Sequence, residues 1–364
     1  VAQINTFAAF TSGTVTAAVS GDMSTLGDLT TDGDKELTIT VTGDITTTEL
    51  TTLNGLTSGT ITLDSDATLT GTYDDVLDAL GDIDNSTEIN VTITDSISVA
   101  NADTLITTQG VTGTITATIT EQDTDTLATI DANSNGAFTI TVARTTEEAV
   151  DADGNVTTEA VESVGAASLT TIKALTTEAI TVTSDTITGD LDDVIAEFIT
   201  ANAGDTPTFV YNSDVALTIT AGTTLTVTQL NNFTDLTTGT VTASMTAAAL
   251  SGFVDDGELT INSGNALTID LNDATSVDAE DVNTLVDATS VSVTFSEGGG
   301  AVIAGTMSEL TTLYASSTAD TPKVVFDAAA ALTVNDVGSI SASDLVDLVG
   351  QDDASEVSID TTVS

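Results

Sequence analysis

The chain has 364 residues, of which 56 are Asp or Glu and only four are Lys or Arg, giving a formal net charge of −52. Nucleic acid is excluded as a partner because phosphate binding needs a basic surface. The absence of Cys and His excludes disulfides, Ser-His-Asp and Cys-His catalysis, and zinc sites with nitrogen or sulfur ligands. Hydrophobic residues make up 40% of the chain, which argues against disorder. No run approaches the ~20 apolar residues of a spanning helix, so we expect no membrane insertion.

The first elements set a pattern that later segments repeat. Residues 1–13 resemble the second half of a repeat, and residues 14–20 form a threonine-rich strand. Residues 37–59 then make a complete repeat of strand, short helix and glycine-ended loop. Residues 60–88 make a longer variant, with a helix expected at Tyr73–Leu80. Each repeat is too small to bury a core alone, so we expect the repeats to pack against one another.

The clearest repeat is residues 97–120, ISVANADTLITTQGVTGTITATIT. In its last strand, isoleucine and alanine alternate with threonine, so one face is aliphatic and the other carries hydroxyl groups. Copies of the Thr-x-Thr pattern recur along the chain; examples begin at Thr14, Thr38, Thr60, Thr92, Thr114 and Thr139. The spacing between several neighbouring copies lies in the range that is typical of stacked coils rather than of one globular core.

The segments between strands carry helix-start signals. A capping residue stands three positions before an acid at Thr46/Glu49, Asp278/Asp281, Thr306/Glu309 and Ser341/Asp344. The cap side chain can accept a free backbone amide while the acid sits in the positive first turn. Apolar residues follow at helical spacing, for example Leu50 and Leu53. These segments therefore predict helices of two or three turns, held by packing on the strands.

An insertion at 144–167 interrupts the repeats and contains a candidate calcium loop. Its oxygen-bearing residues follow the EF-hand spacing at Asp151, Asp153, Asn155, Glu159 and Glu162, although Val156 stands where the turn glycine belongs. Such a spacing can wrap one Ca²⁺. A second, incomplete loop opens with Asp131, Asn133 and Asn135 but has Val142 at its closing position. The alternative is that both segments are acidic surface turns.

After the insertion the pattern resumes at residues 168–175, and residues 190–200 predict a helix. Further repeats are expected in residues 217–245, 267–295, 302–326 and 332–359. The sequence therefore predicts an α/β or mostly-β solenoid that runs continuously over residues 1–364. Its stacked coils would have about 20–30 residues each, with Thr-rich parallel strands and a short capped helix.

The two ends of the sequence complement each other. Reading Val363-Ser364 into residues 1–7 gives VSVAQINTF, which matches ISVANADTL at 97–105. We therefore expect either head-to-tail stacking of subunits or one period of a longer array. The expected assembly interface comprises Val1, Ala2, Ile4, Phe7, Val357, Ile359 and Val363.

Two other functions fit parts of the sequence. Regular Thr-x-Thr arrays resemble ice-binding faces, but the coil lengths vary and threonine is common on any exposed strand. Paired carboxylates could hydrolyse polysaccharides, yet with 56 acids a pair is expected by chance. We therefore expect a protein that is not an enzyme.

The helix, glycine and Thr-Ile-Thr-Ala-Thr-Ile pattern resembles the threonine-rich repeats of large surface proteins in marine bacteria and cyanobacteria, of S-layer, RTX-like or adhesin type. The resemblance covers most of the chain outside 144–167, although the Gly-Gly-x-Gly-x-Asp nonapeptide array is absent. It implies secretion and an extracellular or cell-surface location. The candidate cofactor is Ca²⁺, which the loop at 151–162 predicts, and cell-surface glycans are candidate partners. A self-assembling filament or surface-layer subunit is the favoured function, and a calcium-dependent adhesin stalk is the alternative.

Overall fold

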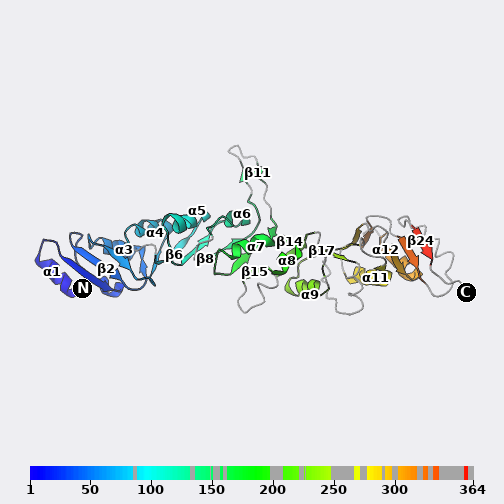
Figure 1. Cartoon of the computed structure of the whole chain (residues 1–364), viewed down its shortest axis with the longest axis horizontal. Coiled ribbons are helices and arrows are strands. Elements are labelled where there is room, and N and C mark those ends of the chain that lie inside the picture. Colours follow the sequence, from blue (N-terminus) through cyan, green and yellow to red (C-terminus); the bar gives the residue numbers. More distant parts are fainter. Residues whose placement is uncertain are drawn as a thin grey trace. The chain divides into compact units, whose positions relative to one another are not determined.

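A computed structural model describes residues 1–84, 88–131, 136–147, 149–150, 156–158, 162–196, 208–220, 225, 227–246, 266–270, 277–288, 292–296, 302–317, 323–326, 331–335 and 356–359. In these parts of the chain, short helices alternate with short strands (Figure 1). The strands form several small sheets, most of them parallel. The α/β class expected from the sequence is confirmed.

The first sheet shows the alternation that the threonine pattern predicts. It joins β1 (Thr16–Gly21), β2 (Glu36–Val41) and β4 (Ile61–Leu63) in that order. In β2, Leu37, Ile39 and Val41 are buried, whereas Thr38 is exposed. Aliphatic side chains thus face the core and threonine faces solvent, because successive side chains of a strand point to opposite faces.

Neighbouring strands pair residues that lie one repeat apart in the chain. Ile39 of β2 lies beside Ile61 of β4. A second sheet places Leu69 beside Val91, and Val91 beside Ile115 of the following repeat. Its strands, in order, are β3 (Ile45–Thr46), β5 (Thr68–Gly71), β6 (Asn90–Ile97), β7 (Ile115–Ile119) and β8 (Gly136–Thr139). Each strand therefore hydrogen-bonds to the corresponding strand of the previous repeat.

The step between paired strands lengthens around residues 144–167. A third sheet contains β9 (Thr141–Val142), β13 (Ile180–Val182) and β15 (Phe209–Tyr211). Thr141 lies beside Thr181, so the chain between these partners is much longer than in the first two sheets. In between, β10 (Ala149–Val150) and β11 (Val156–Thr158) form an antiparallel pair. The short strand β12 (Val164–Gly165) already pairs in parallel with a later strand, so the parallel pairing resumes within the last residues of the predicted insertion.

The second half of the chain repeats this organisation in two more parallel sheets. In the larger sheet, Leu217 lies beside Val241 of the following strand. In the smaller sheet, Leu332 lies beside Val357 in the same way. Besides β12, the larger sheet contains β14 (Thr186–Gly189), β16 (Ala216–Ile219), β17 (Val241–Thr246), β18 (Ala266–Asp270), β20 (Val293–Ser296) and β22 (Val324–Phe326). The smaller contains β19 (Val277–Asp278), β21 (Val302–Gly305), β23 (Ala331–Val334) and β24 (Glu356–Ile359).

Short helices connect the strands. In the described residues these helices are, in chain order, α1 (Ala2–Phe10), α2 (Met23–Leu26), α3 (Thr47–Asn54), α4 (Tyr73–Leu80), α5 (Val99–Asp103), α6 (Thr124–Leu127), α7 (Ala166–Lys173), α8 (Leu191–Val194), α9 (Val227–Leu236), α11 (Ala279–Ala288) and α12 (Met307–Ser317). A π-helical turn, Thr104–Thr108, follows α5. The helix α4 has the predicted bounds. The helix α8 covers only the first part of the helix predicted at 190–200, of which residues 197–200 lie outside the described residues.

Two of the predicted helix caps are formed as expected. At the start of α3, the Glu49 amide donates to Thr46 Oγ1 (3.3 Å) and the Thr46 amide donates to the Glu49 carboxylate (2.9 Å). Thr306 and Glu309 exchange the same two bonds before α12. The apolar face predicted for α3 is also confirmed, since Leu50 and Leu53 are buried. The predicted cap at 341–344 lies outside the described residues.

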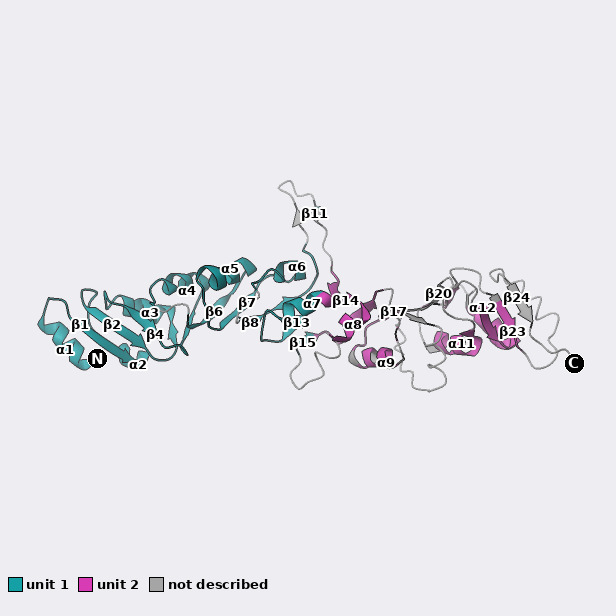
Figure 2. Cartoon of the chain, viewed as in Figure 1, with its two compact units in different colours: residues 1–161, 168–183, 207–210 teal, residues 162–167, 184–206, 211–364 magenta. Residues whose placement is uncertain are grey.

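Contacts divide the chain into two compact units (Figure 2). One comprises residues 1–161, 168–183 and 207–210, and the other residues 162–167, 184–206 and 211–364. In the described parts of both, no helix is long and apolar enough to cross a membrane. A single continuous solenoid over 1–364 stays a prediction.

Candidate functional site

A threonine and a glycine in the loop before β4 fasten this loop to β2, the strand that pairs with β4. Thr57 is buried, and its hydroxyl donates to the Leu37 carbonyl (2.7 Å) while accepting the Leu37 amide (2.8 Å). It also accepts the Gly59 amide (2.9 Å), which closes the turn. A Cβ at Gly59 would collide with the Leu37 backbone, so only glycine allows this approach. We call a threonine and glycine in this arrangement a Thr-Gly clasp.

The clasp recurs in the second unit. Thr237 is buried; its hydroxyl bonds the Val215 carbonyl (2.6 Å) and accepts the Gly239 amide (2.9 Å). A Cβ at Gly239 would collide with the Val215 backbone. The same turn therefore bonds the backbone at the start of the neighbouring strand in both units. The sequence pattern predicted Gly59 as the end of a loop but did not predict the clasp, whose signal is the shared Thr-Ser/Thr-Gly-Thr sequence.

Side-chain oxygens of Asn make a second kind of link between repeats. Asn5 in α1 accepts the Thr30 amide (3.0 Å), and Asn90 accepts the Thr114 amide (2.9 Å). In both cases the donor and the acceptor lie about one repeat apart in the sequence, so each bond joins one repeat to the next. These links add to the backbone ladders and the clasps.

The first repeat contains the clasp without a partner strand among the described residues. The Gly13 amide donates to Thr11 Oγ1 (3.0 Å), as in the two complete clasps. Both residues are exposed, and a Cβ at Gly13 would come within 4 Å only of the Thr11 hydroxyl. In the described parts of the chain β1 pairs with β2 alone. Among the described residues, this edge therefore presents a preformed clasp beside a strand that pairs on one side only.

The expected assembly residues at the start of the chain lie beside this clasp. Phe7 is 65% exposed and Phe10 is 83% exposed, and α1 buries none of its residues. Val1 and Ile4 are half-buried and Ala2 is exposed. At the other end, Val357 and Ile359 lie in β24, and Val363 lies outside the described residues.

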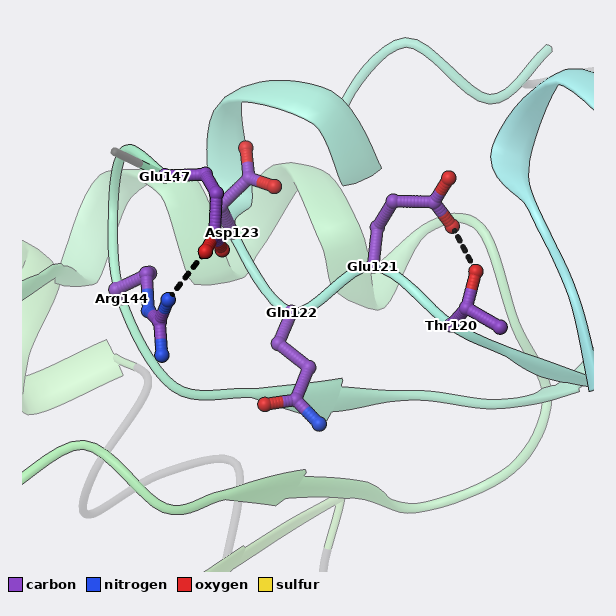
Figure 3. Close-up of a pocket in the computed structure, with 6 residues that line it drawn as sticks. All are labelled: Thr120, Glu121, Gln122, Asp123, Arg144 and Glu147. Atoms are coloured by element: carbon purple, nitrogen blue, oxygen red, sulfur yellow. Dashed lines mark hydrogen bonds and ion pairs between the residues drawn. The ribbon is translucent and has the colours of Figure 1, made fainter. Parts of the chain in front are cut away.

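A cavity of about 410 Å³ opens near the start of the insertion and is lined by Thr120, Glu121, Gln122, Asp123, Arg144 and Glu147 (Figure 3). Arg144 pairs with Glu147 at 2.7 Å. Glu121 accepts the Val99 amide (3.0 Å), and Asp123 accepts the Thr126 amide (2.8 Å) at the start of α6. Each acid thus supports local structure or balances Arg144, so the cavity gives no support to hydrolysis by paired carboxylates.

Most of the candidate calcium ligands lie outside the described residues, namely Asp151, Asp153, Asn155, Glu159, Asn133 and Asn135. Glu162 is exposed just before β12. The Asp131 amide donates to the Asp103 carboxylate (3.0 Å). Over the described residues, the acids form no group of three or more that could hold a metal ion. Calcium binding at either loop stays a prediction.

Comparison of the chain with protein-family models, with curated proteins and with solved structures finds no match.

Proposed function

We propose that the protein is a structural subunit, a solenoid of stacked repeats that assembles end to end into an extracellular filament or surface layer. The observation that carries the proposal is the parallel pairing of strands one repeat apart, seen in both units. A strand edge joined in this way can accept another strand of the same kind. A head-to-tail contact then continues as an open fibre unless its rotation closes a ring.

The charge of the chain bears on the conditions of assembly. A net charge of −52 opposes the approach of two copies, and salt or divalent cations reduce this repulsion. Calcium held in the insertion would lower the charge locally, which is why we include Ca²⁺ as an aid to assembly. Location outside the cell is part of the proposal and rests on the resemblance to threonine-rich surface repeats.

Electron microscopy of the purified chain, with and without millimolar Ca²⁺, tests the proposal. We expect fibres or sheets with one repeating spacing, formed more readily in the presence of Ca²⁺. Isolated particles in both conditions would contradict self-assembly and favour the adhesin stalk. Fibres of equal abundance in both conditions would retain the structural role and remove the role of calcium.

A further inference from the structure

We infer that the edge formed by β1, α1 and the Thr11–Gly13 turn is a docking surface for the strand β24 of a second copy of this chain. The inference rests on the proposed function and specifies its interface. The second copy would add its strand in parallel beside β1, and the clasp would grip the backbone of that strand. Three features of the chain support this docking: the clasp, the helix α1 and the strand register.

First, the exposed Thr11–Gly13 turn has the sequence of the two complete clasps and the same hydrogen bond from the glycine amide to the threonine hydroxyl. Residues 1–16, VAQINTFAAFTSGTVT, align without a gap with residues 47–62, TTELTTLNGLTSGTIT, and with residues 227–242, VTQLNNFTDLTTGTVT. Thr11 therefore corresponds to Thr57 and Thr237. Each of these two threonines bonds the backbone of the preceding strand. The partner expected for Thr11 is thus the backbone of a strand, like the backbone that Thr57 and Thr237 bond.

Second, α1 leaves at least partly exposed the residues that its counterpart buries. Phe7 and Ile4 correspond to Phe233 and Leu230 of α9, which are both fully buried. Phe7 is 65% exposed. The strand after α9 pairs with β16 of the previous repeat, whereas β1 has no such partner among the described residues. Adding a repeat at this edge would remove apolar surface from water, which favours association.

Third, the sequence around β24 has the register needed for this strand to pair with β1. Residues 356–364, EVSIDTTVS, align without a gap with residues 90–98, NVTITDSIS. Residues 1–7 align in the same way with residues 99–105. In the chain, Val91 lies beside Ile115 and Thr92 beside Thr116. By this correspondence Val357 of the second copy would lie beside Val15, and Ser358 of the second copy beside Thr16.

Engineered disulfides test the register, because the chain contains no Cys. Mixing equal amounts of the single variants Thr16→Cys and Ser358→Cys under mild oxidation should give disulfide-linked dimers that contain one chain of each kind. Paired residues on neighbouring strands have the Cα separation that a disulfide requires. The matched control replaces Thr16→Cys by Ser20→Cys, which lies on the same face of β1 but ~13 Å along the strand. We expect at least fivefold less dimer with this control.

Two further variants test the clasp. Gly13→Ala should leave the thermal unfolding of the single chain unchanged, since a Cβ there meets only the Thr11 hydroxyl, but should abolish elongation. Thr11→Val should raise the concentration at which elongation begins about tenfold, because the backbone of the incoming strand loses a hydrogen-bond partner. Equal elongation by Gly13→Ala and wild-type chains would overturn the clasp.

The outcomes separate the interface from the general function. Fibres without the Thr16–Ser358 disulfide would overturn this inference and leave the structural proposal intact. The disulfide without fibres would support the interface and contradict polymer formation. Neither fibres nor the disulfide would contradict both.

Discussion

Thr57 both donates its hydroxyl to the carbonyl of Leu37 (2.7 Å) and accepts the amide of Leu37 (2.8 Å), although the two residues lie 20 positions apart in the chain. One side chain thus satisfies both backbone groups of a residue in the neighbouring strand β2. A buried backbone group without a partner is costly. The clasp therefore explains how a chain with few aromatic residues can fix the register between repeats.

Replacing this threonine by valine keeps the shape of the side chain and removes the hydroxyl. We expect Thr57→Val to lower the free energy of unfolding by about 2–3 kcal/mol, because the Leu37 amide and carbonyl lose their shared partner. Urea unfolding followed by circular dichroism measures the loss. The control is Thr52→Val on the exposed face of α3, where a change within about 0.5 kcal/mol is expected. Equal losses at the two positions would show that the clasp does not stabilise the repeats.

The glycine of the clasp can be tested independently. We expect Gly59→Ala to cost about 1–3 kcal/mol, since its Cβ would collide with the Leu37 backbone and push two repeats apart. Gly33→Ala is the matched control, because its Cβ would have only an ordinary contact with the Gly55 carbonyl at 3.5 Å. If both alanine variants unfold at the same urea concentration, close approach is not the reason for glycine at position 59.

The helix caps support a third prediction. Thr46→Ala removes the side chain that accepts the Glu49 amide and should destabilise the first unit by about 1 kcal/mol. Thr48→Ala, two positions later on the exposed side of α3, should be neutral or slightly stabilising because alanine favours helix. Chemical denaturation of the two variants in parallel gives the comparison. A neutral Thr46→Ala would mean that the capping box adds nothing measurable.

Local patterns in the sequence were enough to predict much of this structure. The alternation in β2 and the capping boxes at Thr46 and Thr306 depend on near neighbours in the chain, so they can be read from a short window. The bounds of α4 follow from the same kind of local signal. Such predictions hold because local preference and packing agree in repeats of this kind.

The contacts between repeats were harder to predict. Thr57 is one threonine among many, and its residue type alone does not distinguish it from the exposed Thr60. Its role depends on the Leu37 backbone, which only the three-dimensional stacking brings within reach. The link from Asn5 to Thr30 was missed for the same reason. Comparing the repeats with one another, position by position, is the sequence signal that could have found these contacts.

A pH titration tests the cap of α2. The Ser24 hydroxyl, the Thr25 hydroxyl and the Thr25 amide donate hydrogen bonds that hold the pKa of the Asp22 carboxyl below its usual range. A carboxyl with a lowered pKa adds stability above its unfolded pKa, about 3.9, and loses it as the pH falls through the folded value. The difference in the free energy of unfolding between the wild type and Asp22→Asn should therefore become smaller below about pH 4. Carboxyl NMR of Asp22 gives the pKa directly, and a midpoint at or above its usual range would contradict the assignment.

Calcium binding at the insertion is the last prediction. If the segment from Asp151 to Glu162 wraps one Ca²⁺ in the EF-hand manner, calorimetric titration should give one site per chain that Asp153→Asn weakens about tenfold or more, because affinity follows the ligand charge. Glu162→Gln should weaken it similarly, since the last position closes the coordination shell.

The matched control for these variants is Asp82→Asn, which removes the same charge from an exposed turn outside the loop. It should leave the affinity of the site unchanged. If all three variants reduce calcium uptake equally, Ca²⁺ associates with the general negative charge of the chain and not with one site. The insertion would then be an acidic surface turn, and the aid that Ca²⁺ gives to assembly would come from the whole surface.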